Sequence, residues 1–167
     1  MMTITPTSVY TIRFSDCDLF GHLNNARYID YFLNAREDHL KEHYNLNLAE
    51  YYQKNISWVV GGHEIAYLRP AVYNEVVSIQ STLLEANPEY LLVETQMKNE
   101  SQSHLKAIMR TKFVPIDIKT GRKAPHESSF LEWAKTIENM AVGQYNTLQE
   151  RINDLLKEKS LSKELVK

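Results

Sequence analysis

Residues 16–25, DCDLFGHLNN, place two carboxylates, a thiol, an imidazole and two amides close together, just ahead of apolar residues at helical spacing. A carboxylate ahead of a helix start faces the unpaired N–H groups of the first turn and the positive end of the helix dipole. These groups could hold an anion or polarise a carbonyl while the carboxylate attacks an acyl carbon or activates water. The pattern therefore indicates acyl chemistry, unless Asp16 and Asp18 only order their loop through bonds to the backbone.

Other familiar catalytic patterns are missing or incomplete. The chain has no G-x-S-x-G, G-x-G-x-x-G, P-loop or H-E-x-x-H motif. His39 and His43 are spaced i, i+4 and could bind a metal ion, but no third ligand follows at a recognisable spacing, and we expect no metal or other cofactor. Cys17 stands between Asp16 and Asp18, whose charges raise the pKa of a thiol, so we expect a small, half-buried residue there.

Composition limits the kind of protein to which this stretch belongs. With 167 residues, 43% of them hydrophobic, the chain is long enough for one domain with a core and short for two. Its 19 basic and 21 acidic residues give a net charge of -2, so no whole-chain charge favours nucleic acid as a partner. The single cysteine, the start MMTITPTSVY without a signal-like pattern, and the lack of a long apolar run lead us to expect a cytoplasmic protein that crosses no membrane.

The elements that must position residues 16–25 are one strand, one long helix and a run of further strands. Apolar and polar residues alternate over residues 8–15 and predict a strand. Apolar residues at helical spacing predict an amphipathic helix over residues 25–43, with Asn24 as its N-cap. Four more extended segments are predicted over residues 56–69, 75–86, 89–100 and 103–118. Their short links favour antiparallel neighbours, so we expect an α+β protein in which one long helix covers a five-stranded sheet.

The last part of the chain is predicted to be helical. Beyond a turn at residues 119–121, the patterns over residues 127–140 and 144–159 are typical of helices. The second helix carries an apolar stripe that must be buried on a protein surface: Leu148, Ile152, Leu155 and Leu156. We therefore expect a domain over residues 1–126 and a helical extension over residues 127–167 that packs on the same domain or on a dimer partner.

The motif F-S-D-C-D-L-F-G-H-L-N-N-A-R-Y-I-D-Y-F, residues 14–32, resembles the signature of the hotdog-fold acyl-CoA thioesterases, specifically the 4-hydroxybenzoyl-CoA thioesterase family. The D-x-D, the glycine three residues after the second Asp, the Asn pair and the following aromatic are all in register. The resemblance covers roughly residues 8–120 and leaves the helical extension outside. It implies an antiparallel sheet wrapped around the long helix, subunits that pair into a continuous sheet, and active sites at the interface of a homodimer or homotetramer.

The resemblance also implies roles for individual residues. Asp18 matches the catalytic carboxylate, which acts as nucleophile or general base, and the backbone amide near Asn25 matches the donor that polarises the thioester carbonyl. His22 resembles the histidine of the G-H-x-N-N variant that is also seen in plant acyl-carrier-protein thioesterases. Four neighbouring residues are expected to contact the substrate: Gly21, Asn24, Tyr28 and Phe32.

The expected function is hydrolysis of an acyl-CoA to the free acid and CoA. The hydroxybenzoyl enzyme carries basic residues for the CoA phosphates at the turn between its third and fourth strands, where this chain has EANPEY. Basic residues that could replace them are Arg110, Lys112, Lys119, Arg122 and Lys123. Three alternatives stay open: hydrolysis of an acyl-carrier-protein thioester, a hotdog hydratase or dehydratase with His22 as base, and a non-catalytic acyl-binding protein.

Overall fold

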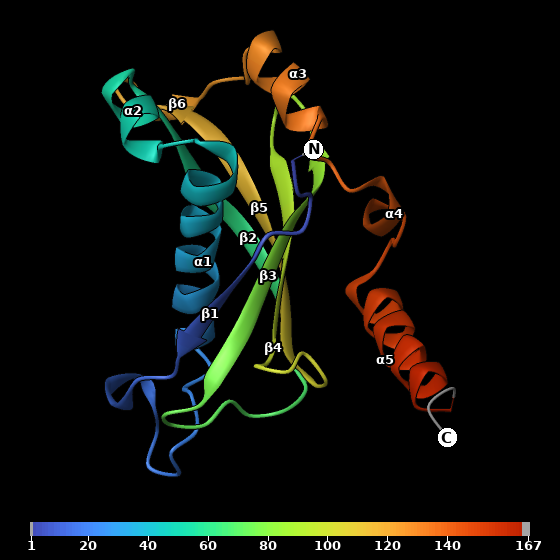
Figure 1. Cartoon of the computed structure of the whole chain (residues 1–167). Helices are drawn as coiled ribbons and strands as arrows, with labels where there is room; N and C mark the ends of the chain where they lie inside the picture. Colours follow the sequence, from blue (N-terminus) through green and yellow to red (C-terminus); the bar gives the residue numbers. More distant parts are fainter. Residues whose placement is uncertain (1, 165–167) are drawn as a thin grey trace.

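The computed structural model describes residues 2–164, with side chains described for residues 2–158 (Figure 1). Its sheet is antiparallel, with the strand order β1-β3-β4-β5-β2, and a short strand β6 pairs with β5. The strands are β1 (Thr7–Thr11), β2 (Ile56–Tyr67), β3 (Val76–Ala86), β4 (Leu91–Asn99), β5 (Leu105–Asp117) and β6 (Arg122–Lys123). The predicted α+β class with five main antiparallel strands is confirmed.

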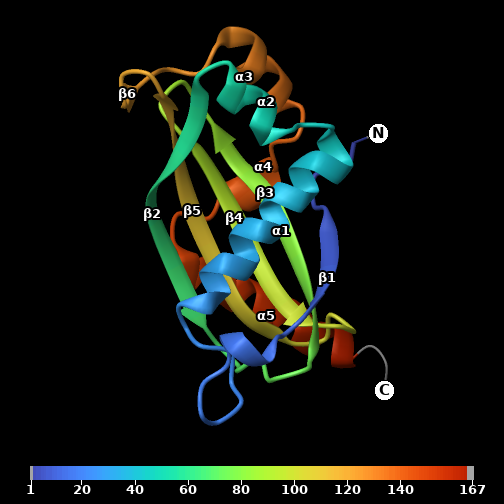
Figure 2. The ribbon, with the colours of Figure 1, turned by 90° about the vertical axis from the view of Figure 1, so that its left-hand side faces the viewer.

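Helix α1 (Arg27–Tyr44) crosses the concave face of the curled sheet (Figure 2). Its buried side chains recur every three to four residues, so one stripe faces the strands. Tyr28, Phe32 and Ala35 pack there against Ile79 of β3 and Met109 of β5. Burying one such large apolar side chain stabilises the fold by about 1.5 to 3 kcal/mol. This packing holds the start of α1 in one place relative to the sheet.

The start of α1 differs from the prediction. The helix begins at Arg27 with Ala26 as its N-cap, so the assignment of Asn24 as N-cap is wrong. Asn24 instead shapes the preceding turn: its Oδ1 accepts a hydrogen bond from the Ala26 N–H (3.1 Å), and its carbonyl oxygen accepts one from the Arg27 N–H (2.8 Å). Both bonds are local, and the turn they close leaves Asn25 exposed at the helix start.

Two further elements depart from the predicted ranges. The first strand ends at Thr11, and residues 14–16 form a turn of 3-10 helix instead of its continuation. A short helix, α2 (Leu48–Gln53), follows α1 and was not predicted. Its N-cap is Asn47, whose Oδ1 accepts a hydrogen bond from the Ala49 N–H (3.0 Å). A helix of six residues is too short for a periodic pattern to reveal it.

The predicted helix over residues 127–140 ends early, as α3 (Ser128–Lys135), and a separate short helix, α4 (Met140–Gly143), follows after a break. The break has a tertiary cause. Strand β3 has an irregular register between Leu83 and Glu85, and the Leu83 carbonyl oxygen accepts a hydrogen bond from the Asn139 N–H (2.8 Å). This bond draws the chain out of helical geometry and along β3.

Helix α5 (Leu148–Glu164) covers the face of the sheet opposite α1, as Figures 1 and 2 show from two sides. Leu148 and Ile152 are buried against Ile108 of β5, and Leu155 is half-buried beside them. The expected burial of Leu156 is wrong, since that side chain is exposed. The stripe thus packs on the chain's own sheet. Within residues 2–164 no helix is both long and apolar enough to cross a membrane.

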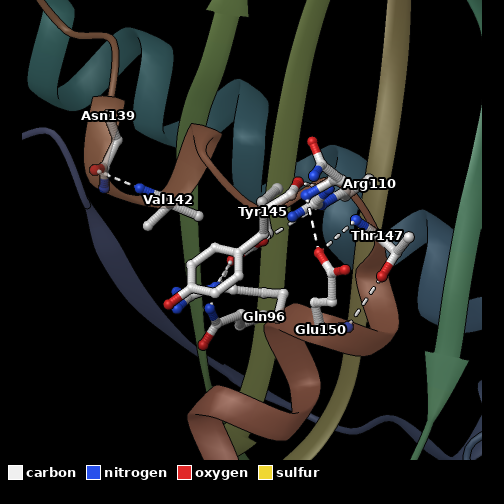
Figure 3. A network of polar contacts seen from close by, with 10 residues as sticks. Gln96, Arg110, Asn139, Val142, Tyr145, Thr147 and Glu150 are labelled. Atoms are coloured by element: carbon white, nitrogen blue, oxygen red, sulfur yellow. Dashed lines mark hydrogen bonds and ion pairs between the residues drawn. The ribbon is translucent and has the colours of Figure 1, made fainter.

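A buried charge cluster adds to this contact between α5 and the sheet. Glu94 of β4 is 1% exposed, and its carboxylate lies 3.1 Å from Arg151 Nε of α5 and 3.6 Å from Arg110 Nε of β5. Figure 3 shows Arg110 reaching the loop ahead of α5, where its Nη1 donates to the Tyr145 carbonyl oxygen (3.0 Å). Removing one member of such a cluster leaves a buried charge unpaired, which is strongly destabilising. The cluster therefore fixes where α5 lies on the sheet.

Candidate active site

The loop between β1 and α1 folds back on itself over residues 16–24. The Asp18 N–H donates to the His22 carbonyl oxygen (2.8 Å), and the Asn24 N–H donates to the Asp16 carbonyl oxygen (2.9 Å). The turn that both pairs enclose requires Gly21, whose φ of 71° lies in the left-handed region that glycine adopts without strain. The structure therefore gives Gly21 a conformational role in the loop.

The segment between β2 and β3 holds this loop in place. The Leu23 N–H donates to the Ala71 carbonyl oxygen (2.8 Å), and the Tyr73 N–H donates to the Gly21 carbonyl oxygen (2.8 Å). The Leu23 side chain is buried in the core between these two bonds. The loop is thus attached to the body of the protein at both ends of its turn.

The carboxylate of Asp18 is exposed and oriented by its own loop. Its Oδ1 accepts hydrogen bonds from the backbone N–H groups of Phe20 (2.9 Å) and His22 (3.0 Å). Both bonds use the same oxygen, and among the described residues no hydrogen bond uses Oδ2. This arrangement presents a carboxylate oxygen of defined direction to the solvent beside the start of α1.

Asp16 has a different environment although it carries the same group. It is half-buried, and its Oδ2 accepts a hydrogen bond from the Tyr31 hydroxyl of α1 (2.8 Å). That hydroxyl oxygen in turn accepts one from the Arg13 N–H (3.0 Å). Burial, together with the bond to Asp16, raises the pKa of Tyr31. Asp16 therefore links the loop to α1 through a side chain, whereas the bonds to the backbone that the loop-ordering explanation expected are made by Asp18.

The thiol of Cys17 is half-buried, as predicted. Its Sγ donates a hydrogen bond to the Arg13 carbonyl oxygen (3.3 Å). Burial raises the pKa of this thiol, and the carboxylates of Asp16 and Asp18 raise it further. The environment therefore favours the neutral thiol and not the nucleophilic thiolate.

The helix start brings together predicted residues and one that sequence reasoning missed. His22, Asn24 and Asn25 are all exposed, and the backbone pairs described above set His22 opposite Asp18 in the loop. The missed residue is Tyr67, at the end of β2, whose hydroxyl donates to the Asn25 carbonyl oxygen (2.8 Å). Tyr67 is 42 positions away in sequence, and its place in an alternating strand pattern carries no signal of this contact. Tyr67 thus holds the backbone at Asn25, where an amide is expected to polarise the carbonyl of a thioester.

Two predicted substrate contacts lie in the core instead of at this surface. Tyr28 is 2% exposed and Phe32 is 0% exposed. The Tyr28 hydroxyl accepts a hydrogen bond from the Ala71 N–H (3.0 Å), and its ring packs edge-on to that of Tyr67 with the centroids 5.1 Å apart. Tyr28 therefore supports Tyr67 and the segment that holds the loop, and Phe32 is part of the core.

Exposed apolar side chains surround Asp18. They are Phe14, Leu19, Phe20, Val72 and Tyr73, all at least 41% exposed. The rings of Phe14 and Tyr73 make an edge contact with centroids 5.8 Å apart, so part of this surface is already assembled. An exposed apolar patch beside a polar site marks a binding surface for a ligand or another protein.

An apolar cavity of about 230 Å³ lies away from this loop, between the second half of α1, the sheet and α3. Leu33 and Leu40 of α1 line one side, and the rings of Trp58, Phe130 and Trp133 line another. None of the residues 15–25 belongs to its wall. Within a single copy of the chain, the apolar cavity and the Asp18 loop are thus separate.

The histidine pair on α1 does not form a metal site. Both ring nitrogens of His39 are engaged, Nδ1 with Ser81 Oγ (2.8 Å) and Nε2 with Ser8 Oγ (3.1 Å), while His43 is exposed. Across the described part of the chain, no group of three or more His, Cys, Asp or Glu side chains could hold a metal ion. His39 belongs to a buried polar network between α1 and the sheet.

The basic residues considered for phosphate binding are divided by the structure. Arg110 is 8% exposed and committed to the Glu94 cluster, so it is not available to CoA phosphates. Lys119, Arg122 and Lys123 are exposed around the turn between β5 and β6. The β6 strand that carries Arg122 and Lys123 lies at the opposite end of the sheet from the loop ahead of α1 (Figure 1).

Comparison with known proteins gives this geometry a context. Residues 12–134 match the model of the family described as the Thioesterase-like superfamily. The chain is 30% identical over 115 residues to the long-chain acyl-CoA thioesterase FadM of Escherichia coli (strain K12), which covers 69% of this chain and 86% of that protein.

Solved structures are similar as well. The probable thioesterase YbaW from Escherichia coli matches with a TM-score of 0.68 and 28% identity, covering 79% of this chain and 98% of that one. A DHNA-CoA thioesterase from Staphylococcus aureus matches with a TM-score of 0.73 and 17% identity, covering 93% of this chain and 95% of that one. The second likeness concerns the fold alone. Together they confirm the expected hotdog fold.

Proposed function

Because the chain belongs to the Thioesterase-like superfamily, we propose that it hydrolyses acyl-CoA thioesters to the free acid and CoA, with Asp18 as the catalytic carboxylate. The observation that carries this assignment is the state of Asp18 itself. The side chain is exposed in the loop ahead of a helix start, and two backbone N–H groups hold one of its oxygens, while among the described residues no hydrogen bond uses the other. Such a carboxylate can meet a thioester carbonyl that lies against the first N–H groups of α1.

Two routes through Asp18 balance chemically. As nucleophile, the carboxylate forms an anhydride with the acyl group, the C–S bond breaks, CoA leaves as thiolate, and water cleaves the anhydride. As general base, Asp18 takes a proton from water, the hydroxide adds to the carbonyl, and collapse of the adduct expels the thiolate. In both routes the negative oxygen that develops is stabilised by the backbone amide near Asn25 and the positive end of the α1 dipole.

The site is completed, in this proposal, by a second copy of the chain. Strand β2 lies at an edge of the sheet, spans 12 residues, and exposes Val59 and Val60 near its middle. A long exposed edge of this kind is a template for pairing with another strand. Antiparallel pairing of two β2 strands gives a two-fold dimer with a continuous sheet. It places the first residues of β2 in one copy beside the last residue, Tyr67, in the other.

This pairing also supplies positive charge for CoA. The first residue of β2, Ile56, is opposite Asp117 of β5, and Asp117 pairs with Arg122 of β6. Strands are about 4.8 Å apart, so the β5–β6 turn of one copy lies about 10 to 15 Å from the end of β2 in the other. Lys119, Arg122 and Lys123 would then face the phosphates of a CoA whose thioester is at Asp18. We place this reaction in the cytoplasm, because a chain with a single cysteine has no internal disulfide of the kind that is typical of oxidising compartments.

The test is release of free thiol from acyl-CoA substrates of several chain lengths and from one aryl-CoA, with the purified full-length chain. We expect turnover with at least one substrate and a loss of at least about 100-fold in kcat for Asp18→Asn with its fold intact. Two results would contradict the proposal: hydration of an enoyl-CoA without thiol release, or near-normal hydrolysis by Asp18→Asn. Cleavage of acyl-carrier-protein thioesters alone would refute the CoA part.

A further inference from the structure

The apolar cavity beneath α3 has no part in the chemistry described so far. Its volume is about 230 Å³. A cavity of about 150 Å³ with aliphatic and aromatic walls binds benzene, a molecule of six carbons, so at the same volume per carbon this one holds about nine carbons. The buried charge that adjoins it, Arg36, already donates through Nη1 to Ser81 Oγ (3.1 Å) and lies over the Tyr44 ring. The cavity therefore suits an uncharged aliphatic chain.

Helix α3, from the C-terminal extension, forms the end wall of this cavity. Phe130 and Trp133 line it one helical turn apart, and their ring centroids lie 5.6 Å from each other. Phe130 is held from behind, with its ring stacked on His126 at 5.0 Å and tilted against Trp58 at 5.5 Å. His126 is itself fixed, because its Nε2 accepts a hydrogen bond from Trp58 Nε1 (2.8 Å). The wall is therefore a set of aromatic rings that constrain one another and not a loose flap.

The cavity is open along the side of α1. Asn34 and Glu37, which belong to its lining, are exposed. At a rise of about 1.5 Å per residue, Leu33 and Leu40 lie about 9 and 20 Å along the helix from its start at Arg27. Within one copy, the buried rings of Tyr28 and Phe32 fill the space between the helix start and the cavity.

The paired copy offers a second path. Ser57 and Trp58, at the beginning of β2, line the cavity. When two β2 strands pair over their full length, this beginning lies beside the end of β2 in the other copy, where Tyr67 contacts the Asn25 carbonyl oxygen. The side of the cavity that Ser57 and Trp58 form in one copy thus lies next to the helix start of the other.

We propose that the acyl chain of a thioester bound at Asp18 of one copy enters this cavity of the paired copy, and that Phe130 and Trp133 limit the chain to about nine carbons within the cavity. The inference rests on the proposed thioesterase function and adds its substrate class, a medium-chain aliphatic acyl group. It makes α3 a specificity element that lies outside the D-x-D motif and its loop.

Occupancy of the cavity can be measured without any hydrolysis. The chain has two tryptophans, Trp58 and Trp133, and both line the cavity. Titration with S-decyl-CoA, a thioether that cannot be hydrolysed, should change tryptophan emission saturably, whereas CoA without a chain should not. Unchanged emission while S-decyl-CoA inhibits hydrolysis competitively would overturn the inference and leave the proposed function standing. A saturable change in emission from a chain that hydrolyses no thioester would overturn the proposed function and leave acyl binding in the cavity standing.

The role of the end wall is tested by changing its size. Phe130→Ala should raise the ratio of kcat/KM for a 14-carbon to an 8-carbon acyl-CoA by about tenfold or more, because one extra methylene in a filled pocket already changes discrimination by about that factor. Glu132→Ala, on the exposed side of α3, is the matched control and should leave the ratio unchanged. If Phe130→Ala does not fold, Leu33→Trp narrows the cavity and should abolish turnover of the 8-carbon substrate while sparing acetyl-CoA. Either folded variant with a wild-type length profile would refute the proposal.

The assignment to the paired copy has its own test. Hybrid dimers are prepared from one wild-type copy and one copy that carries both Asp18→Asn and Phe130→Ala. The remaining carboxylate belongs to the wild-type copy, and the cavity that it uses in this proposal belongs to the variant copy. We expect the shifted chain-length profile of Phe130→Ala. A wild-type profile in the hybrid would show that each site uses its own cavity.

Discussion

At the scale of single residues, Asp16 and Asp18 show how the surroundings separate two identical groups. Both carboxylates belong to one short loop, and both accept hydrogen bonds. Asp16 is half-buried and bound to the Tyr31 hydroxyl, whereas Asp18 is exposed and bound only to backbone N–H groups of its own turn. One side chain therefore holds the loop on α1, and the other is free to meet a substrate.

The two carboxylates should respond differently to the same substitution. Asp16→Asn replaces the charged acceptor of the Tyr31 hydroxyl with a neutral amide oxygen, which accepts a weaker hydrogen bond, and should lower the melting temperature, with a loss in kcat well below the loss of at least about 100-fold expected for Asp18→Asn. Thermal melts and steady-state kinetics on both variants give the comparison. The reverse order of kinetic effects would mean that the other carboxylate of the D-x-D acts on the substrate.

Cys17 lies between these carboxylates, and its predicted contribution to catalysis is small. Cys17→Ser keeps the size and the hydrogen-bond donor to the Arg13 carbonyl oxygen, and it removes a thiol whose pKa is raised by burial and by both aspartates. We therefore expect most of the activity to remain, as measured by thiol release. Loss of several orders of magnitude in a folded variant would place the thiol in the mechanism.

At the scale of elements, α1 joins the site to the core, and it does so with polar as well as apolar side chains. Tyr28 and Phe32 pack on the strands, and one turn beyond them Arg36 and His39 are buried beside Ser81 of β3. Burial, and after it the nearby charge of Arg36, lowers the pKa of His39 to about 4. His39 therefore remains neutral in the folded protein.

This imidazole makes stability depend on pH. The unfolded chain binds a proton at His39 near its ordinary pKa of about 6.5, and the folded chain binds it only near about 4. Stability is therefore complete above about pH 6.5 and falls as the pH decreases toward 4, by about 3 kcal/mol in total. Urea unfolding of His39→Gln should show a smaller loss over this range than the wild type.

His43→Gln tests a smaller part of the same effect, because the His43 ring lies 5.9 Å from the His39 ring and its charge contributes to the lowered pKa of His39. The loss of unfolding free energy toward pH 4 in this variant should lie between those of the wild type and His39→Gln. Equal pH dependence in His39→Gln and the wild type would show that another group titrates on unfolding in this range.

At the scale of the whole molecule, both faces of the sheet are covered and one long edge is free. Helix α1 occupies the concave face and α5 the opposite face, as Figures 1 and 2 show. Strand β2 remains at the edge with Val59 and Val60 exposed. Association through this edge is therefore the arrangement that the coverage of the faces favours.

Dimer formation through β2 is open to a direct test. Val60→Asp places a charge in the proposed seam and should convert a dimer into a monomer with little activity, since in the proposed function the partner copy completes each site. Sedimentation equilibrium and thiol release measure the two effects. Leu156→Asp, exposed on α5, serves as a control for an added surface charge. A wild-type monomer with full activity would contradict the model of a shared site.

The second prediction at this scale concerns the extension. Removal of residues 144–167 takes away the burial of Leu148 and Ile152, worth about 1.5 to 3 kcal/mol each before entropy. It also leaves Glu94 without Arg151 and Arg110 without the Tyr145 carbonyl oxygen. We expect a lower melting temperature or a changed oligomer, with the hydrolytic chemistry at Asp18 largely retained. If the truncated protein has the melting temperature and the oligomeric state of the full-length chain, α5 contributes nothing to the fold.

Local patterns in the sequence by themselves determined most of the elements. Period-2 alternation and helical spacing depend on neighbours a few residues apart, and for that reason they located the five main strands and α1. The D-x-D, Gly21 and the two asparagines also form a short-range motif, so the position of the loop and its resemblance to a thioesterase could be predicted. The error at Asn24 is of the same kind, because the capping pattern identified the turn but not the residue at which the helix begins.

Only the tertiary structure decided how distant segments meet. Tyr67 reaches the Asn25 backbone from a strand 42 positions away, and Arg110 is buried against Glu94 where the sequence suggested a phosphate contact. The cavity requires α1, β2 and α3 together, and no single segment carries its signature. These contacts depend on how a twisted sheet brings remote chain segments together, and that information is spread over the whole sequence and is absent from any one stretch of it.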